Sequence, residues 1–537
     1  MLTKVTTNPT DIAPELRDAF VRYERALMRN DVAELDALFA DSPETIRSDR
    51  GTTLVGHVAI GAFRAGRSGA PLRELLRVHT RAIGDGAAVL VAESRRADGG
   101  LAVQTQVWER GPDGRWVVST AHVSGDPAPA TGESDETGDP AIWRIPPSNS
   151  PLAVGAPEGD LAHARIAVKD LFAVEGYPIG AGNPTWLRSA APESENAGAV
   201  SALLAAGGDV VGIAQTDEFA FSLAGTNPHW GTPPNPAAPD RITGGSTSGP
   251  AVAVAAGFAD VGLGTDTAGS IRVPASYCGL YGLRTTHGAV TRAGLLGLAP
   301  SFDTVGVLTR DADMLARSAR ALLPRQAEHA ITDIVFAPEL IALAEPEVQR
   351  AFAAALFALT VRDAPSGREL PAPTPCSLQF PEGADLDSVF TAFRTVQQAE
   401  AWRLHGEFAS HHPEALGSET AARLQAGARV TAEAEARACA LLDRTRELLR
   451  GALPPGRLLA LPSTSSPAPL RGSNPESVER TRAATLRLTC LASLAGLPAL
   501  SIPSALVGTL PVGICLIAGA DEDRSLVRFA AGEGGPS

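Results

Sequence analysis

The sequence has few cysteines, and their spacing gives them no structural pattern. The chain has 537 residues and five cysteines, which are far apart, odd in number and never in a Cys-x-x-Cys arrangement. This argues against a disulfide framework and against a structural zinc site. Such cysteine usage is typical of a reducing compartment. We therefore expect a cytoplasmic protein that needs no metal and no cofactor.

Long apolar runs and an excess of basic residues are also missing. The N-terminal residues contain no apolar stretch of the signal-peptide type. No run reaches the ~18 uninterrupted apolar residues that a membrane span needs. The formal net charge is −14, whereas non-specific nucleic-acid binding needs a basic surface. We expect neither a membrane nor a nucleic acid as a partner.

The length predicts more than one domain. Residues 125–140 are rich in Gly, Pro, Asp, Glu and Thr and hold no bulky apolar side chain. A segment of this composition cannot contribute to a core and is typical of a linker. We expect a first domain at 1–125, a linker at 126–150 and a second domain at 151–537.

The first domain begins with apolar residues at helical spacing and continues with alternating runs. Two helices are predicted within residues 13–40, with Asp11 and Asp31 as N-caps. Their apolar positions are Leu16, Phe20, Tyr23, Leu27, Leu35, Leu38 and Phe39. The runs AAVLVAESRR, LAVQTQVWER and RWVVSTAHVS alternate and predict strands. Helices followed by an antiparallel sheet indicate a small α+β domain.

The order of these elements carries a resemblance. The helix pair, then TIRSDRGTTLVGHVAIGAFRAGR, QTQVWER and VVSTAHVS, resembles the cone-shaped nuclear-transport-factor-like (SnoaL-like) fold over residues 10–125. More narrowly, it is similar to small proteins of bacterial cyanuric acid degradation that are associated with dicarboxyurea breakdown. The resemblance implies a carboxylate-binding pocket formed by Tyr23, Arg47, Arg64 and Arg67. Arginine suits this task because its planar fork binds a carboxylate bidentately.

A plainer interpretation of the same residues stays open. Most charged side chains lie on the surface. The three arginines would then be solvated charges, and Tyr23 would pack within the helix pair.

The second domain alternates helical and strand-like stretches. GAVSALLAAGGD and SGPAVAVAAGF predict helices, and VVGIAQT, VGLGTDT, LLALPS and LPALSIPS predict short buried strands. This pattern indicates an α/β domain with a mixed sheet packed between helices.

The most informative stretch spans residues 244–284, where two glycine-rich loops each contain a serine. The segments are GGSTSG, AVAVAAG, GTDTAGSIRVP and CGLYGLR. Loops of small residues can aim several backbone N–H groups at one point, as an oxyanion hole requires. Single loops of this kind are usually plain turns or phosphate cradles, but neither a P-loop motif nor a G-x-S-x-G elbow occurs here.

These segments resemble the amidase signature family. The resemblance extends over residues 150–530 and includes VKDLFAVEG, LPSTSSPAP and LPALSIPS. It implies a Ser–cisSer–Lys set: Ser270 as nucleophile, Ser246 after a cis peptide bond as relay, and Lys169 as base. The serines are 24 residues apart, as the family pattern requires.

The resemblance also implies an oxyanion hole made of the N–H groups of Thr267, Ala268, Gly269 and Ser270. Glycine is usual at the position of Ala268, and a similar alanine occurs in allophanate hydrolases of the family. Ser248 could bind substrate or could cap the following helix.

The residues themselves agree with this chemistry. A serine hydroxyl is a weak nucleophile until a base removes its proton. Lysine can be that base only if its pKa falls from ~10.4, which burial achieves. Lys169 lies in the largely apolar run IAVKDLFAV. His287 could suggest a serine–histidine pair, but the lysine arrangement accounts better for the loops.

We therefore predict a serine amidohydrolase that cleaves C–N bonds of linear amides through an acyl-enzyme on Ser270. The first domain hints at a carboxylated urea or biuret-type substrate. One alternative is an arylacetamide amidase of the indoleacetamide type, which HWGTPPNPAAPDRITGGSTSG resembles. Another is a non-catalytic, transamidosome-like or scaffold subunit whose first domain is a binding module. A homodimer is compatible with each.

Overall fold

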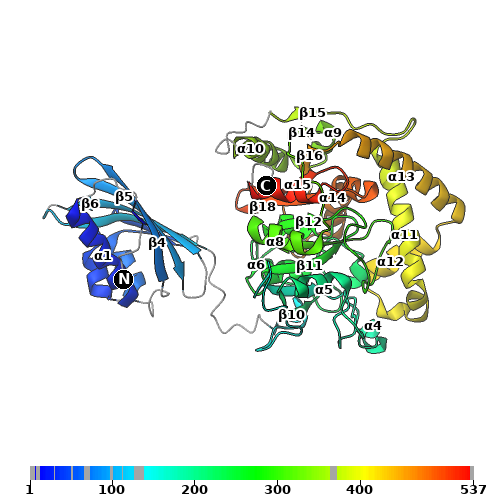
Figure 1. The fold of residues 1–537 in the computed structure, drawn as a ribbon, viewed down its shortest axis with the longest axis horizontal. Helices are drawn as coiled ribbons and strands as arrows, with labels where there is room; N and C mark the ends of the chain where they lie inside the picture. Colours follow the sequence, from blue (N-terminus) through cyan, green and yellow to red (C-terminus); the bar gives the residue numbers. More distant parts are fainter. Residues whose placement is uncertain are drawn as a thin grey trace. The chain divides into compact units, whose positions relative to one another are not determined.

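The computed structural model divides the chain into two compact units, Met1–Glu133 and Ser134–Ser537, called unit 1 and unit 2 (Figure 1). The described residues are 6–7, 13–29, 31–49, 52–65, 73–96, 101–111, 113–125, 138–362 and 372–532. Residues 126–137 of the predicted linker lie outside them, and residues 138–150 belong to unit 2. Every cluster of buried apolar residues draws its members from one unit alone. Each unit therefore has its own core.

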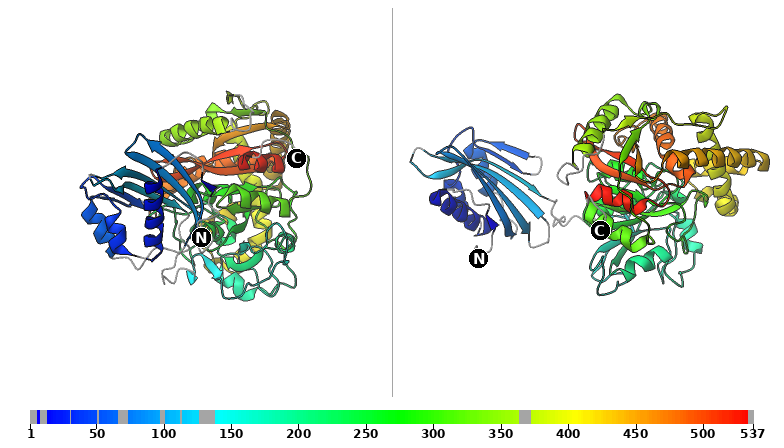
Figure 2. Two further views of the ribbon diagram at one scale, coloured as in Figure 1. Left: turned by 60° about the vertical axis from the view of Figure 1, so that its left-hand side comes forward. Right: turned by 45° about the horizontal axis from the view of Figure 1, so that its top comes forward.

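Unit 1 is a curved sheet with helices packed on one face (Figure 2). The helices are α1 (Pro14–Arg29), α2 (Val32–Ala37) and α3 (His57–Ala65). The strands are β1 (Thr6–Thr7), β2 (Ile46–Asp49), β3 (Thr52–Val55), β4 (Arg73–Ile83), β5 (Ala87–Arg96), β6 (Leu101–Arg110) and β7 (Trp116–Gly125). Their order is β1-β4-β5-β6-β7-β2-β3. Strands β4 to β7 pair antiparallel, and β2 joins β7 in parallel.

The elements of unit 1 follow the predicted pattern. Helix α1 buries Leu16, Phe20 and Tyr23 against the sheet. Asp31 caps α2 by accepting a hydrogen bond from the Glu34 N–H at 3.1 Å, whereas Asp11 lies outside the described residues. The three alternating runs are β5, β6 and β7. Strand β4 was not predicted, because its sequence does not alternate between apolar and polar residues near Leu75. The structure has an irregularity at the same place, where the pairing register with β5 shifts between Leu75 and Arg77.

Unit 2 is built on an eleven-stranded mixed sheet with the order β15-β14-β16-β18-β17-β12-β13-β11-β9-β10-β8. The strands are β8 (Trp143–Ile145), β9 (Arg165–Lys169), β10 (Asp209–Ala214), β11 (Val261–Asp266), β12 (Tyr281–Arg284), β13 (Thr304–Thr309), β14 (Asp333–Phe336), β15 (Thr374–Pro375), β16 (Arg457–Pro462), β17 (Ala499–Val507) and β18 (Leu510–Ile517). Parallel pairs such as β9–β11 stand beside antiparallel pairs such as β11–β13.

Helices cover both faces of this sheet, as predicted from the short apolar runs. Along β16, Leu458 and Ala460 belong to one core cluster, and Leu459 and Leu461 belong to another. Successive strand side chains point to opposite faces, so both faces of β16 are buried. A strand buried on both faces reads as a continuous apolar run, such as RLLALP.

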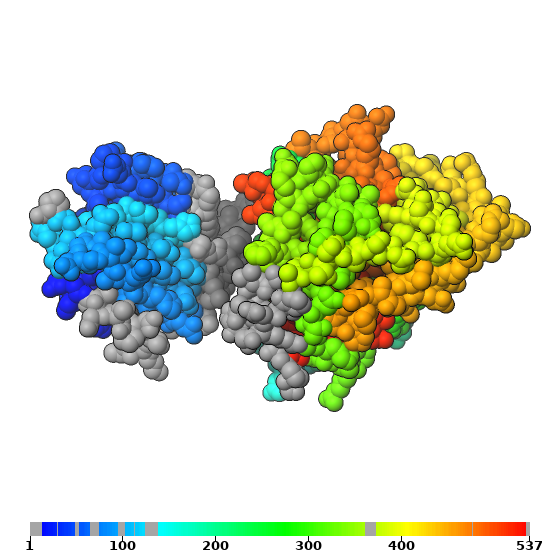
Figure 3. Space-filling view, turned by 90° about the horizontal axis from the view of Figure 1, so that it is seen from above, coloured from blue at the N-terminus to red at the C-terminus, as the bar shows by residue number. Residues whose placement is uncertain are grey.

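The helices of unit 2 differ widely in length. They are α4 (Pro184–Ser189), α5 (Gly198–Ala205), α6 (Ser248–Ala255), α7 (Arg272–Cys278), α8 (Ala312–Leu322), α9 (Pro338–Ile341), α10 (Pro346–Arg362), α11 (Leu386–His411), α12 (Ser418–Ala428), α13 (Ala432–Ala452), α14 (Pro475–Ala495) and α15 (Asp523–Ala531). Helices α11 to α13, in yellow to orange, form one end of this unit's surface (Figure 3). Among the described residues, no helix combines the length and apolar character needed to cross a membrane.

The separate cores predict that unit 2 folds without unit 1. A chain of residues 138–537 should unfold cooperatively, with a midpoint within a few degrees of the matching transition in the full chain. Circular dichroism during heating measures this. A fragment that aggregates, or that melts without a cooperative transition, would contradict the prediction.

Candidate active site

Lys169 ends a central strand of unit 2 and is completely buried. Strand β9 pairs in parallel with both β10 and β11, and the Lys169 side chain is 0% exposed. Its Nζ donates to Ser246 Oγ at 2.8 Å, to Thr265 Oγ1 at 2.8 Å and to Thr247 Oγ1 at 3.1 Å. In the described part of the chain, no carboxylate lies within ion-pair distance of this amine.

This environment changes the chemistry of the amine. Burial lowers the pKa of Lys169 to about 7, although the more distant charges of Asp217, Asp266 and Asp303 act in the opposite direction. Desolvation disfavours the ammonium form, and three neutral hydroxyl groups do not compensate for it as a carboxylate would. Lys169 is therefore a base that can be neutral near pH 7.

Ser246 lies in the first glycine-rich loop, and the peptide bond before it is cis. Its backbone carbonyl accepts hydrogen bonds from Thr216 Oγ1 at 3.0 Å and from the Asp217 N–H at 3.2 Å. Gly245 packs so closely on Asp217 that a Cβ there would overlap the carboxylate. Only glycine fits this position, which explains the second glycine of the loop.

Ser270 lies in the second loop, is 3% exposed and precedes helix α7. Its backbone carbonyl accepts the Thr247 N–H at 3.2 Å, which joins the two loops. Thr247 and its neighbour Ser246 are in turn hydrogen-bonded to Lys169 Nζ through their hydroxyl groups. The structure thus brings the three predicted residues into one buried region of unit 2.

Asp266 holds the second loop together with Arg272. Arg272 donates to both oxygens of this carboxylate, at 3.0 Å and 2.9 Å, and Arg284 donates at 3.3 Å. Burial alone would raise the pKa of Asp266, but the charges of Arg272 and Arg284 outweigh it and hold the pKa below its ordinary value. The carboxylate therefore remains charged and fixes the loop.

The backbone donors of the second loop differ from the predicted set at one residue. The Gly269 N–H donates to Asp266 Oδ1 at 2.8 Å, so it is occupied within the loop. No protein acceptor is found in the described residues for the N–H groups of Thr267, Ala268 and Ser270. Thr489 fixes this segment by donating from Oγ1 to the Ala268 carbonyl at 2.5 Å. Three free donors, rather than four, can therefore face a developing oxyanion.

Ser248 does not cap helix α6, which corrects the capping alternative. It is the first residue of the helix, and Thr247 occupies the N-cap position. Ser248 Oγ instead donates to Asp217 Oδ1 at 3.2 Å. Burial raises the pKa of Asp217 to about 6. Ser248 thus connects helix α6 to the carboxylate against which Gly245 packs.

His287 is not placed to replace Lys169 as the base. Its Nε2 lies 2.9 Å from the Pro300 carbonyl oxygen, and burial lowers its pKa. A ring nitrogen that faces a carbonyl must carry the proton and act as a donor.

Tyr23, Arg47 and Arg64 of unit 1 are buried, which is against the surface-charge alternative for the two arginines. These two side chains and Tyr23 are 9%, 7% and 3% exposed. Arg64 donates to the Leu35 carbonyl at 2.8 Å, and its guanidinium lies 3.9 Å from the centre of the Phe39 ring. Arg67 lies outside the described residues.

Two glutamines of this region were missed. Gln104 Nε2 donates to the Tyr23 hydroxyl at 2.8 Å, and Gln106 Oε1 accepts from Trp108 Nε1 at 3.0 Å. The Gln106 Nε2 atom is buried and has no hydrogen-bond partner in the part of the chain that the structure describes. Alternation along LAVQTQVWER puts both glutamines and Trp108 on one face. Polar residues on the buried face of a strand were the signal that could have identified them.

Comparisons with known proteins match both units. The family described as "Amidase" matches residues 139–527, and the family described as "AtzH-like" matches residues 5–127. Amidase 1 of Arabidopsis thaliana is 33% identical over 404 residues, covering 71% of this chain and 94% of that protein. A glutamyl-tRNA(Gln) amidotransferase subunit of Methanothermobacter thermautotrophicus is 31% identical over 408 residues, covering 73% of this chain and 88% of that protein.

A solved structure agrees with these matches. It is described as the inhibitor-bound form of a vestigial protein complex that reveals the evolutionary origins of an s-triazine catabolic enzyme. Its TM-score is 0.62 at 26% identity, covering 70% of this chain and 84% of that chain. The resemblances predicted from sequence and the predicted fold class are confirmed.

The low pKa of Lys169 predicts how Ser270 responds to pH. Below about pH 7 the amine becomes an ammonium ion and cannot accept a proton, so Ser270 should react slowly; above this pH it should react fast. The rate at which a fluorophosphonate reagent labels Ser270 should rise through pH 7. Ser270→Ala and Lys169→Met should abolish labelling. A rate that is flat from pH 5 to pH 9 would contradict the role of Lys169.

Proposed function

The chain belongs to the amidase family, and on this basis we propose that it hydrolyses a small-molecule carboxamide through an acyl-enzyme on Ser270. The observation that carries the proposal is the hydrogen bond between Lys169 Nζ and Ser246 Oγ inside a buried, carboxylate-free shell. It supplies a base and a relay beside the second loop, which carries Ser270. A scaffold protein would not need this arrangement.

The proposed reaction has two halves. Ser270 gives its proton to Ser246, which passes its own proton to neutral Lys169, while Ser270 Oγ attacks the amide carbon. The N–H groups of Thr267, Ala268 and Ser270 stabilise the oxyanion. Lys169 returns the proton through Ser246 to the leaving nitrogen, and ammonia or an amine departs. Water then attacks the acyl group by the same proton path, which releases the acid and restores Ser270.

We propose a carboxylated urea or biuret-type compound as the substrate class. The AtzH-like match over residues 5–127 and the s-triazine connection of the similar structure support this class. In unit 1, Tyr23, Arg47 and Arg64 form the proposed site for a carboxylate group, with Gln104 beside Tyr23.

Two alternatives lead to different experimental results. An arylacetamide amidase would prefer indoleacetamide to urea derivatives. The similarity to part of an amidotransferase keeps open the second alternative, a chain that works within an assembly. We retain the cytoplasm as the proposed location, which the five free cysteines support.

Ammonia release from a panel of amides tests the proposal. Wild-type protein should release ammonia from biuret-type compounds faster than from indoleacetamide. Ser270→Ala and Ser246→Ala should each reduce kcat by at least about 10³-fold, since a weak nucleophile loses its activation. Ser504→Ala, on the half-buried part of β17, is the control and should keep full activity. Unchanged turnover in Ser270→Ala would refute the proposal.

The role of unit 1 is tested by binding. Isothermal titration of the full-length Ser270→Ala protein with malonate should detect a dicarboxylate site. Arg47→Gln in that background should weaken binding by about 10-fold or more, since one hydrogen bond to a charged group contributes about 1.5–3 kcal/mol. Arg115→Gln, an exposed arginine of the same unit, should bind as before. Equal affinities in all three proteins would show that this pocket does not bind carboxylates.

A further inference from the structure

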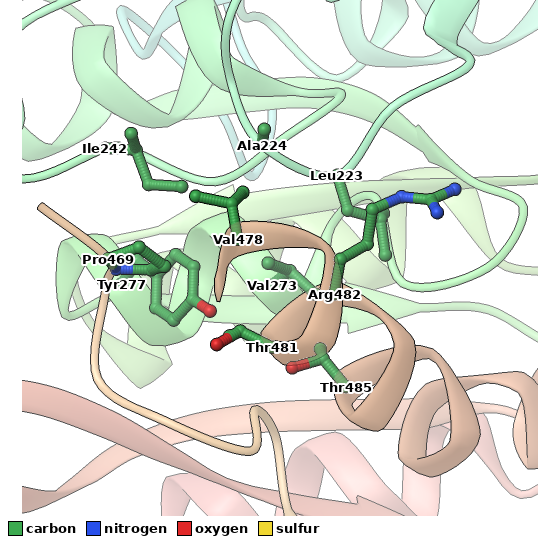
Figure 4. Close-up of a pocket in the computed structure, with 10 residues that line it drawn as sticks. All are labelled: Leu223, Ala224, Ile242, Val273, Tyr277, Pro469, Val478, Thr481, Arg482 and Thr485. Carbon is green, nitrogen blue, oxygen red and sulfur yellow. The ribbon is translucent and has the colours of Figure 1, made fainter. Parts of the chain in front are cut away.

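A narrow apolar neck lies beside the two serine loops of unit 2. Its walls include Leu223, Val273, Tyr277 and Val478, and Arg482 also lines it. The volume of the neck is about 20 Å³, which is room for about one water molecule. Figure 4 shows Tyr277 and the guanidinium of Arg482 at opposite ends of this group, with the two valines between them.

The neck is walled by neighbours of both serines. Val273 follows Ser270 by one helical turn in chain order. The Gly245 N–H, next to Ser246, donates to the Leu223 carbonyl at 2.9 Å. Residues that follow Ser270 or contact the loop of Ser246 therefore form part of its walls.

A hollow of about 540 Å³ shares the lining residues Ala224, Ile242, Val478 and Arg482 with the neck. Its charged lining residues are Arg394, Arg423, Arg482, Glu419 and Glu479. Three arginines face two glutamates, so the lining carries one more positive charge than negative. This excess stands out in a chain whose net charge is −14.

Arg482 is the most deeply placed of these arginines in electrostatic terms, because burial shifts its pKa. It pairs with Glu479 at 3.0 Å, but that glutamate side chain is 56% exposed whereas Arg482 is 15% exposed. Its Nε atom is buried and has no hydrogen-bond partner among the described residues. Burial lowers the pKa of Arg482 to about 10, and the charges of Arg423 and Arg394 act in the same direction. The guanidinium is still charged at neutral pH, next to two other cations.

We propose that this hollow binds a carboxylate at the far end of the amide substrate, with Arg482 as the residue that selects it. An anion there would pair with the guanidinium of Arg482 and offset the repulsion among the three arginines. A single negative charge balances the excess of one positive charge, which favours a carboxylate over a dianionic phosphate. The inference rests on the proposed function, because it assumes that the other end of the compound reaches Ser270.

Helix α14 sets the distance between the two ends. Arg482 and Thr489 are seven residues apart on this helix, which is about 10 Å at 1.5 Å per residue. Thr489 contacts the Ser270 loop through the Ala268 carbonyl. The carboxylate and the scissile amide should therefore be separated by a spacer of several bonds.

A series of ω-amido acids tests the proposal. Malonamate, succinamate, glutaramate and adipamate are each compared with the neutral diamide of the same length. At the best spacer length, wild-type protein should prefer the carboxylate by about 10–100-fold in kcat/KM, as expected for one charge-assisted contact. Arg482→Gln should lose this preference through a higher KM with kcat little changed. Arg482→Lys should keep part of it, since the charge remains without the fork.

Controls separate the two claims. Arg480→Gln, exposed on the same helix and absent from both cavity linings, should keep the wild-type preference. Equal preference in wild type and Arg482→Gln, or no preference in wild type, would overturn the role of Arg482 and leave the amidase proposal intact. If wild type hydrolysed no amide, the proposed function would fail. Titration of glutarate into Ser270→Ala, with and without Arg482→Gln, would then still test the site: equal affinity would overturn it.

Discussion

The site depends on one constraint: Lys169 is buried without a carboxylate. Burial destabilises an ammonium ion at this position. The hydrogen-bond partners of Lys169 are three neutral hydroxyl groups and not a carboxylate. The chain has only two lysines, Lys4 and Lys169, and 44 arginines. Arginine stays protonated at every physiological pH. Lys169 is thus the one amine among the described residues that can become neutral and act as a base.

The two loops around this amine are held by a different kind of interaction. Asp266 is also buried, but it is paired with Arg272 and Arg284 and remains charged. The pair of arginines anchors the second loop to helix α14 and to strand β12, because Arg272 also donates to the Thr489 carbonyl. A fixed ion pair thus positions the loop that carries Ser270, while the unpaired lysine is the base of the proposed reaction. Lys169 and Asp266 are both buried. Asp266 stays charged because two arginines pair with it, whereas Lys169 has no such partner and its pKa falls.

Much of this could be predicted from the sequence. The glycine loops, the apolar context of Lys169 and the alternation in β5 to β7 are local patterns, and local patterns predict local structure. The cis peptide bond between Gly245 and Ser246 was predicted from the family resemblance. What the sequence did not predict depends on contacts between distant segments. The Gly269 N–H is occupied because the Asp266 carboxylate lies beside it in the folded chain. Ser248 bonds to Asp217 for the same kind of reason. Arg482, which lies 212 residues after Ser270, approaches the neck only because α14 packs beside the second loop.

The central claim can be measured directly on the amine. Because the chain has two lysines, protein labelled with ¹³C at lysine Cε should give two Cε resonances, and Lys169→Met identifies one of them. Following the Lys169 resonance from pH 5 to pH 11 yields its pKa. We expect a midpoint near 7 for Lys169. A midpoint near the ordinary value of ~10.4 would mean that Lys169 is charged at neutral pH and cannot be the base.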